Sequence, residues 1–222
     1  MNTNSILLTI AVLGGTGKEG KGLAYRWAQA GYRVIIGSRT AEKAKAAAAD
    51  LNALLGDESV VGLENVDAAS RADILVLTVP YSAHASTLEM IRDAAQGKIL
   101  VDVTVPLVPP KVTKAQMPPA GSAAQEAQSI LGEDVNVVAA FQNISHEHLF
   151  SDDPINCDVL VAGKGKDARL EALKLVDAVG MVGWDAGPIE NSMVIEGLTS
   201  LLIYINKQNG VKSAGIKITG IQ

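Results

Sequence analysis

A glycine-rich turn follows the first apolar run of the chain. The run Ile6–Leu13 is apolar and leads into the stretch VLGGTGKEGKG, as a buried parallel strand does when it ends in glycines. The spacing Gly15-x-Gly17-x-x-Gly20 is typical of a turn that binds dinucleotides: the first glycine allows a tight turn, the second lets the main chain approach a pyrophosphate, and the third lets a helix pack on the strand. We therefore expect a helix from Gly20 whose amino end faces phosphates.

Two other interpretations of the turn are excluded by neighbouring residues. A nucleoside triphosphate-binding loop requires Ser or Thr directly after its lysine to hold Mg²⁺, but Gly22 follows Lys21. Short-chain dehydrogenases combine a glycine motif with a Tyr-x-x-x-Lys pair, and no tyrosine of this chain has a lysine four positions later.

Strands and helices alternate along most of the chain, which predicts an α/β fold with a doubly wound parallel sheet of the Rossmann type. The change of pattern after a proline-rich segment at 107–119 predicts a small C-terminal α+β part. We expect a dinucleotide-binding domain over 1–143 and a small C-terminal part over 144–222. The expected strands are 6–13, 32–39, 59–64, 73–80, 98–106, 135–141, 157–163 and 181–187. The expected helices are 20–30, 40–55 (capped by Thr40), 65–72, 82–96, 122–131, 167–179 and 190–208.

The end of the second strand selects the dinucleotide. An acidic residue there would bind the 2′-hydroxyl of NAD, but the sequence is Gly37-Ser38-Arg39-Thr40. Arg39 can pair with a 2′-phosphate and Ser38 can donate a hydrogen bond to it. Lys43 adds a second cation, and Thr16 can reach the same phosphate. The sequence therefore predicts NADP.

The ends of the fourth and fifth strands line the crevice in which ligands bind such sheets. We expect Val79, Pro80, Val103 and Thr104 to pack along the nicotinamide. His84 follows Pro80 by one helical turn, where it either contacts the cofactor or lies on the helix surface.

Composition excludes several classes of protein. The net charge of -5 and the 4% content of aromatic residues argue against a nucleic-acid partner. Cys157 is the only cysteine, which excludes an intramolecular disulfide and a cysteine-based zinc site. The pair His146-x-His148 is more typical of a solvated loop than of a metal site, so we expect no metal. The N-terminal residues resemble neither a signal peptide nor a membrane span, which predicts a cytoplasmic protein with no membrane partner.

Several stretches resemble the NADPH-dependent reductases of coenzyme F-420 (hereafter F420), an 8-hydroxy-5-deazaflavin. They are LGGTGKEGKGLA, GSRTAEKA, DILVLTVP, DAGPIENSMVIEGLTSLL and NGVKSAGIKI. The resemblance implies a homodimeric oxidoreductase that moves a hydride between NADPH and C5 of the deazaflavin, its small-molecule electron acceptor. It also places a set of residues at the NADP site, namely Thr16, Gly17, Lys18, Glu19, Ser38, Arg39 and Lys43.

The acceptor side of the resemblance departs from the family pattern. Gln142 stands where the family has a histidine, Gly197 where it has a serine, and Met193 where it has a basic residue. Gln142, Asn143 and Ile144 are the expected contacts of the acceptor, with Gly197 leaving space beside them. An apolar slot for the ring is expected from Val79, Val103, Phe141, Ile144 and Leu198, and cations for its anionic tail from Lys207 or Lys212.

Two alternatives to this function remain open. One is an NADPH-dependent reductase of the same fold with another acceptor, such as a flavin, an imine or a carbonyl. The other is an NADP-binding sensor without activity.

Hydride transfer between stacked rings needs alignment rather than acid–base help, so no catalytic residue is expected. The apolar helix 190–208 predicts a homodimer. We therefore expect the C-terminal part, 144–222, to serve the acceptor and dimerisation, beside an NADP-binding domain over 1–143.

Overall fold

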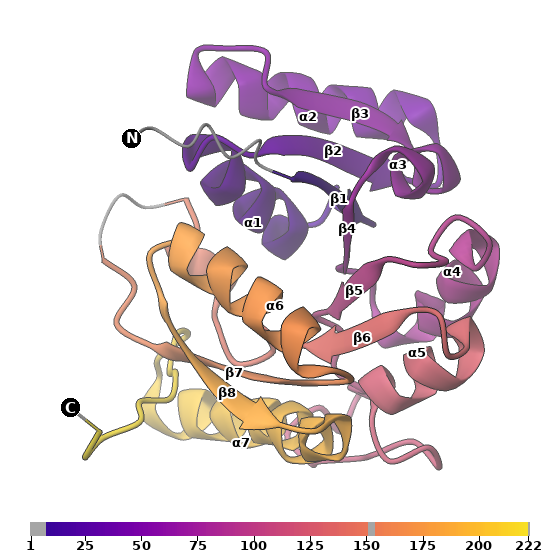
Figure 1. Ribbon diagram of the computed structural model, residues 1–222. Coiled ribbons are helices and arrows are strands. Elements are labelled where there is room, and N and C mark those ends of the chain that lie inside the picture. Colours follow the sequence, from indigo (N-terminus) through magenta and orange to yellow (C-terminus); the bar gives the residue numbers. More distant parts are fainter. Residues whose placement is uncertain (1–7, 151–153, 222) are drawn as a thin grey trace.

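One eight-stranded sheet forms the centre of the protein (Figure 1). The structure is a computed structural model that describes residues 8–150 and 154–221. All of the strands expected from the sequence are present in the sheet; residues 6 and 7 of the first lie outside the described residues. The strands are β1 (Thr9–Leu13), β2 (Arg33–Ser38), β3 (Val60–Glu64), β4 (Ile74–Leu77), β5 (Ile99–Asp102), β6 (Asn136–Ala139), β7 (Asp158–Gly163) and β8 (Val182–Gly187).

The order of the strands is β3-β2-β1-β4-β5-β6-β7-β8. The first six are parallel, so the predicted doubly wound parallel sheet is confirmed. Strand β7 pairs antiparallel to β6, and β8 pairs parallel to β7. The chain reverses its direction of winding between β1 and β4, which is where such sheets bind ligands.

The predicted boundary at residue 143 falls between β6 and β7, and the sheet continues across it. The division into two domains therefore stays a prediction.

Helices cover both faces of the sheet. They are α1 (Lys18–Gln29), α2 (Ala41–Leu55), α3 (Asn65–Arg71), α4 (His84–Ile91), α5 (Ala123–Leu131), α6 (Lys166–Ala178) and α7 (Ser192–Asn209), with short 3₁₀ turns at Tyr81–Ala83, His146–His148 and Ile189–Asn191. Buried side chains of α1, α2 and α6 belong to one hydrophobic cluster, and those of α3, α4 and α5 to another. Helix α7 packs beside α5 and β7.

Three local expectations differ from the structure. Helix α4 ends at Ile91, and turns occupy the residues up to Gly97, because apolar spacing alone does not separate a helix from successive turns. Strands β4 and β5 end early, so Val79 and Thr104 lie in loops; Pro80 has no N–H with which to extend the ladder. Thr40 occupies the position before α2 but its side chain makes no capping hydrogen bond.

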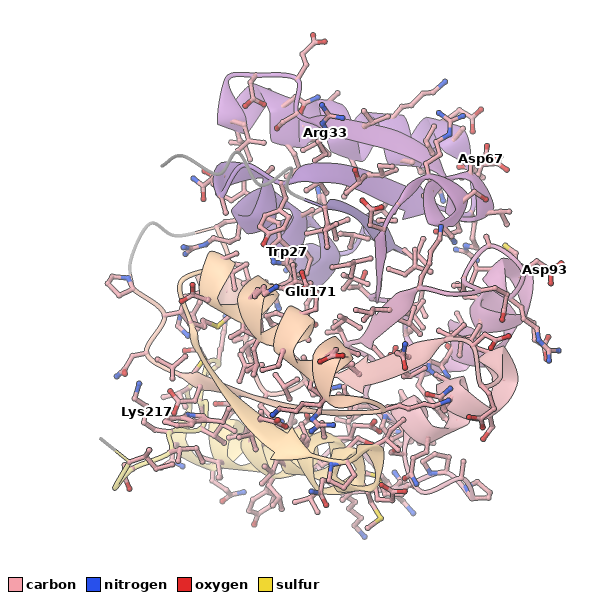
Figure 2. The ribbon with its side chains drawn as sticks, viewed as in Figure 1. Trp27, Arg33, Asp67, Asp93, Glu171 and Lys217 are labelled. Carbon is pink, nitrogen blue, oxygen red and sulfur yellow. The ribbon has the colours of Figure 1, made fainter. Side chains whose placement is uncertain are left out.

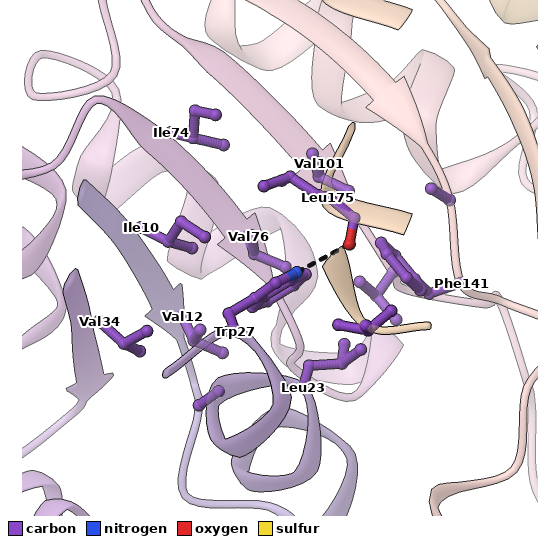
Figure 3. Close-up of a cluster of buried hydrophobic side chains, with 14 of the residues drawn as sticks. Ile10, Val12, Leu23, Trp27, Val34, Ile74, Val76, Val101, Phe141 and Leu175 are labelled. Atoms are coloured by element: carbon purple, nitrogen blue, oxygen red, sulfur yellow. Dashed lines mark hydrogen bonds between the residues drawn. The ribbon is translucent and has the colours of Figure 1, made fainter. Parts of the chain in front are cut away.

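Trp27, on α1, packs in the core against α6 and Phe141 (Figures 2 and 3). Its indole Nε1 donates to the carbonyl oxygen of Leu175 on α6, at 3.0 Å. Its ring meets that of Phe141 edge-on, with centroids 5.7 Å apart, a favourable arrangement for aromatic pairs. Both rings are nearly inaccessible to solvent. Residues from both sides of the 143/144 boundary therefore share one hydrophobic core.

Candidate functional site

A cavity of about 1250 Å³ opens at the carboxyl ends of the parallel strands. The lining residues from 14 to 87, here called the cofactor side, come from the glycine turn, the end of β2, and the segments that follow β2, β3 and β4. The lining residues from 142 to 214, here called the acceptor side, come from the segment after β6, from α7 and from the chain after it. Residues 103–112 lie between the two sides in sequence and also contribute to the lining.

The glycine turn has the shape that a pyrophosphate requires. A Cβ on Gly17 would meet nothing within 4 Å, so the main chain there borders open space. A Cβ on Gly20 would lie 2.6 Å from Thr78 Oγ1 and 2.7 Å from Gly15 Cα, so this glycine keeps α1 close to β4 and the turn. Helix α1 begins at Lys18 with no side-chain cap, which leaves its first N–H groups free to bind an anion. The residues present therefore fit a dinucleotide.

The residues expected to recognise a 2′-phosphate lie together. Thr16, Ser38, Arg39 and Lys43 all line the cavity. Arg39 and Lys43 are exposed, while Ser38 is buried. No acidic side chain at the end of β2 occupies the place of a ribose ligand, because the strand ends with Ser38. The arrangement is cationic at the point where NADP and NAD differ.

Asn65 belongs to the cofactor side but was not predicted from the sequence as a site residue. It is 3% exposed, lines the cavity, and accepts a hydrogen bond from the N–H of Gly14 through Oδ1 at 3.2 Å. This bond holds the start of the glycine turn against the beginning of α3. A polar residue directly after β3 was a usable signal, because β3 ends at the same edge of the sheet as β1.

The residues expected beside a nicotinamide have two different positions. Val79, Pro80, Val103 and Thr104 line the cavity as predicted. His84 does not: its side chain is inaccessible to solvent and lies behind the lining, so it is neither on the cavity wall nor on the helix surface. The burial of His84 could not be predicted from its position in the sequence, because a histidine in the first turn after a strand can equally lie on the helix surface.

Asp102, at the end of β5, is the partner of His84. Its Oδ2 lies 2.7 Å from His84 Nε2, and its Oδ1 accepts the N–H of Thr104 at 2.9 Å. Burial lowers the pKa of His84, but the hydrogen bond to Asp102 and the negative charges of Asp102 and Glu126 outweigh burial and raise it. The sequence signal was a single acid inside an apolar strand, which is rarely left unpaired.

On the acceptor side, the two predicted amide side chains have fixed orientations. Gln142 Nε2 donates to the carbonyl oxygen of Asp102 at 2.7 Å. Asn143 Nδ2 donates to the carbonyl oxygen of Ile195 at 2.9 Å and to Thr199 Oγ1 at 3.1 Å. Both amide oxygens are buried without a hydrogen-bond partner among the described residues. Buried polar atoms without partners are rare, so these two are acceptors available to an N–H group.

Other residues of the predicted acceptor pocket are divided between the cavity and the core. Ile144 and Lys212 line the cavity. Phe141 packs against Trp27, and a Cβ on Gly197 would face Met117 and Ala115. Phe141 and Gly197 therefore shape the pocket only through their neighbours. The cavity lining also leaves out Gly15, Leu198 and Lys207.

A buried carboxylate positions α7 beneath the acceptor side. Glu196 is inaccessible to solvent and accepts the N–H groups of Ala123 and Ala124 at 2.7 and 3.1 Å, at the amino end of α5. Burial raises the pKa of Glu196 to about 8, against the lowering effect of these two bonds. Because Glu196 lies one turn before Thr199, this contact fixes the helix that presents Thr199 to the cavity.

The C-terminal segment is held against β7, close to the cavity rim. Asp158 accepts the main-chain N–H of Ile218 at 2.8 Å and lies 3.1 Å from Lys217 Nζ. The residues 211–214 that join this segment to α7 supply part of the lining.

Two kinds of feature are absent from residues 8–150 and 154–221. This part of the chain has no cluster of three or more His, Cys, Asp or Glu side chains arranged to hold a metal ion. None of its helices is both long enough and apolar enough to cross a membrane.

Comparison with known proteins identifies similar chains. Residues 9–106 match the family described as NADP oxidoreductase, coenzyme F420-dependent. An F420-dependent NADP reductase of Methanothermobacter thermautotrophicus is 44% identical, with 97% of each chain covered. An F420-dependent NADP reductase of Methanocaldococcus jannaschii is 39% identical, with 97% of this chain and 100% of the relative covered.

A solved structure from Arthrobacter sp. FB24, a candidate F420-dependent NADP-reductase, is 25% identical. It matches with a TM-score of 0.80 over 96% of this chain and 100% of its own. The similarity therefore extends over the acceptor side as well as the cofactor side.

Proposed function

The chain belongs to the family of coenzyme F420-dependent NADP oxidoreductases, and from that premise we propose that it transfers a hydride between NADPH and F420. The resemblance noted in the sequence is thereby confirmed. When bound side by side, the two cofactors supply the chemistry, since a hydride passes directly from one ring to the other. The protein supplies binding, alignment and exclusion of water.

The observation that carries the proposal is the single cavity shared by both sides. It joins a glycine turn and two exposed cations, Arg39 and Lys43, to a wall of buried amides. A volume of about 1250 Å³ is larger than a single drug-sized ligand needs. We propose that NADP occupies the cofactor side, with its pyrophosphate at Gly17 and its 2′-phosphate at Arg39.

The acceptor side supports a ring that carries an N–H group between carbonyls, as the pyrimidine part of a deazaflavin does. The amide nitrogens of Gln142 and Asn143 are already bonded within the protein, so only their oxygens remain to bind a ligand. Ile144 and Val103 supply apolar surface for the ring. Lys212 lines the acceptor side and supplies a cation for the anionic tail.

We propose that the active form is a homodimer built on α7. This helix exposes apolar side chains along one side: Met193 45%, Val194 61%, Leu201 53%, Tyr204 51% and Ile205 44%. An apolar stripe of this length on a helix is typical of an interface, and a second copy of the chain supplies a matching apolar stripe. We expect a dimer by light scattering at micromolar concentration and a monomer when Leu201 is changed to Glu. A wild-type monomer contradicts the proposal.

The test of the activity is an anaerobic mixture of enzyme, NADPH and F420. We expect the visible absorbance of oxidised F420 to fall, and Gln142→Ala to slow the decrease. Parallel reactions contain FMN, FAD or a simple imine in place of F420. Reduction of one of these with no change in F420 contradicts the proposed acceptor, and no oxidation of NADPH with any acceptor indicates a sensor.

A further inference from the structure

A buried pair of ionisable side chains lies directly behind the wall between the two sides of the cavity. His84 begins α4 and Asp102 ends β5, and neither side chain is accessible to solvent. The distance from His84 Nε2 to Asp102 Oδ2 is 2.7 Å. The other ring nitrogen, Nδ1, is buried and has no hydrogen-bond partner among the described residues. Nε2 therefore donates to the carboxylate in both charge states, and the proton that is gained or lost belongs to Nδ1.

Asp102 holds two parts of the cavity wall in addition to His84. Its Oδ1 accepts the N–H of Thr104 at 2.9 Å, and its main-chain oxygen accepts the amide of Gln142 at 2.7 Å. Thr104 and Gln142 both line the cavity. Asp102 thus bonds directly to two residues that line the cavity, and only low-dielectric protein separates its charge from the cavity.

We propose that the His84–Asp102 pair is a specificity-determining element of the nicotinamide site, which holds Thr104 and Gln142 in place and whose net charge sets the preference for oxidised or reduced cofactor. With His84 protonated, the pair is neutral. With His84 neutral, the pair carries one negative charge. The nicotinamide ring is cationic in NADP⁺ and neutral in NADPH, so the negative pair favours NADP⁺.

The groups around His84 determine the pH at which the pair changes its charge. Asp102 faces it from β5 and Glu126 from α5, and the ring of Tyr81 lies 5.8 Å from its own. Tyr81 donates to Glu126 at 2.7 Å. Glu196, on α7, lies close enough to Asp102 and Glu126 for their charges to raise its pKa.

Because the pKa of His84 is raised above 6.5, the pair is neutral below that value and becomes negative as the pH rises through the pKa of the folded protein. The affinity for NADP⁺ relative to NADPH therefore rises with pH. At an effective dielectric constant of about 20, one charge at side-chain distances changes the affinity for a cation on the order of tenfold.

The experiment measures the dissociation constants of NADP⁺ and NADPH by calorimetry between about pH 6 and pH 9, without any acceptor. The proposal rests on the proposed binding of NADP but not on that of F420. If the acceptor is not F420, this proposal about the His84–Asp102 pair is unaffected. The 2′-phosphate and pyrophosphate occur in both cofactors, so their titration cancels in the ratio of the two constants. Burial raises the pKa of Glu19, in the first turn of α1, to about 8, and its interaction with these shared phosphates cancels as well.

Three proteins are compared: wild type, His84→Gln and the control His148→Gln. Gln at 84 keeps an N–H for Asp102 but cannot gain a charge; His148 is a partly exposed histidine outside the lining. We expect the ratio to change on the order of tenfold with pH in the wild type and the control, and to stay constant in His84→Gln. A pH dependence that persists in His84→Gln overturns the proposal.

A second measurement uses only the wild type, in case the variant does not fold. The chain has three histidines, so their imidazole nitrogen signals can be assigned by NMR. Binding is reciprocal, so NADP⁺ must lower the pKa of His84 further than NADPH does. Equal pKa values of His84 in the two complexes overturn the proposal.

Discussion

The two sides of the cavity offer different kinds of groups to a ligand. On the cofactor side, the groups are main-chain N–H donors of a glycine turn and the exposed side chains Arg39 and Lys43. On the acceptor side, they are buried amides, Gln142 and Asn143, whose nitrogens are tied to β5 and α7. The cofactor side is thus built mainly from short segments with exposed cations, whereas the acceptor side is a network that several distant elements hold together.

This difference indicates how each side tolerates change. An exposed cation contributes its own contact, and its removal leaves the neighbours in place. A buried amide also supports its partners, so its removal leaves donors and acceptors unsatisfied at each end. Single substitutions should therefore act locally on the cofactor side and collectively on the acceptor side.

The largest expected effect concerns the core that both sides share. Trp27→Ala removes a fully buried ring between α1 and α6 and should lower the free energy of unfolding by about 3–5 kcal/mol. The chain has two tryptophans, so Trp184 on β8 alone reports the unfolding of the C-terminal part in this variant. We expect one transition by Trp184 fluorescence and by circular dichroism. Two separate transitions would instead support independent domains divided near residue 143.

The next effect compares two glycines of the same turn. Gly17→Val places a side chain in the open space of the turn, while the φ of -74° and ψ of 167° at that position suit any residue. The affinity for NADPH should fall by about 100-fold or more with no loss of thermal stability. Gly20→Val should lower the melting temperature as well, because its Cβ collides with Gly15 and Thr78. Equal NADPH affinity in Gly17→Val and the wild type would contradict the placement of the pyrophosphate.

The third effect tests whether a cation on the cofactor side acts alone. Arg39→Ala should weaken NADPH by about ten- to a hundredfold, equivalent to about 1.5–3 kcal/mol for one charge-assisted contact. The affinity for NADH should stay nearly constant, because NADH lacks the 2′-phosphate. Arg33→Ala is the matched control, since Arg33 is exposed at the other end of β2 (Figure 2). An equal loss for both cofactors would show that Arg39 does not recognise the phosphate.

The smallest effect concerns the acceptor side. Thr199→Val keeps the shape of the side chain but removes the hydroxyl that donates to the carbonyl oxygen of Gln142 and accepts from Asn143. The KM for F420 should rise by about five- to tenfold, as for the loss of a hydroxyl that makes two part-buried hydrogen bonds, while the dissociation constant of NADPH stays unchanged. Thr199→Ser should restore the wild-type KM. A change in NADPH affinity without a change in the KM for F420 would place Thr199 on the cofactor side and contradict its assignment to the acceptor side.

The elements of the fold were accessible from the sequence because their signals are local. Each strand is a short apolar run and each turn has its glycines or prolines, so all of the expected strands appear in the sheet. The antiparallel pairing of β7 was not specified, since an apolar run does not record the direction of its neighbour. The ends of β4 and β5 also differ from expectation, because pairing stops where the partner strand stops.

The cofactor side was largely determined by the sequence itself. Its groups lie within short segments, 15–20 and 38–43, whose spacing places them at one helix end and one strand end. The acceptor side was decided by the tertiary structure. Gln142 and Asn143 were named from the sequence, but their orientations depend on Asp102 and Thr199, which are 40 and 56 residues away. His84 is buried for the same reason: a side chain's accessibility depends on what packs over it, and contacts between distant segments leave no periodic pattern in the chain.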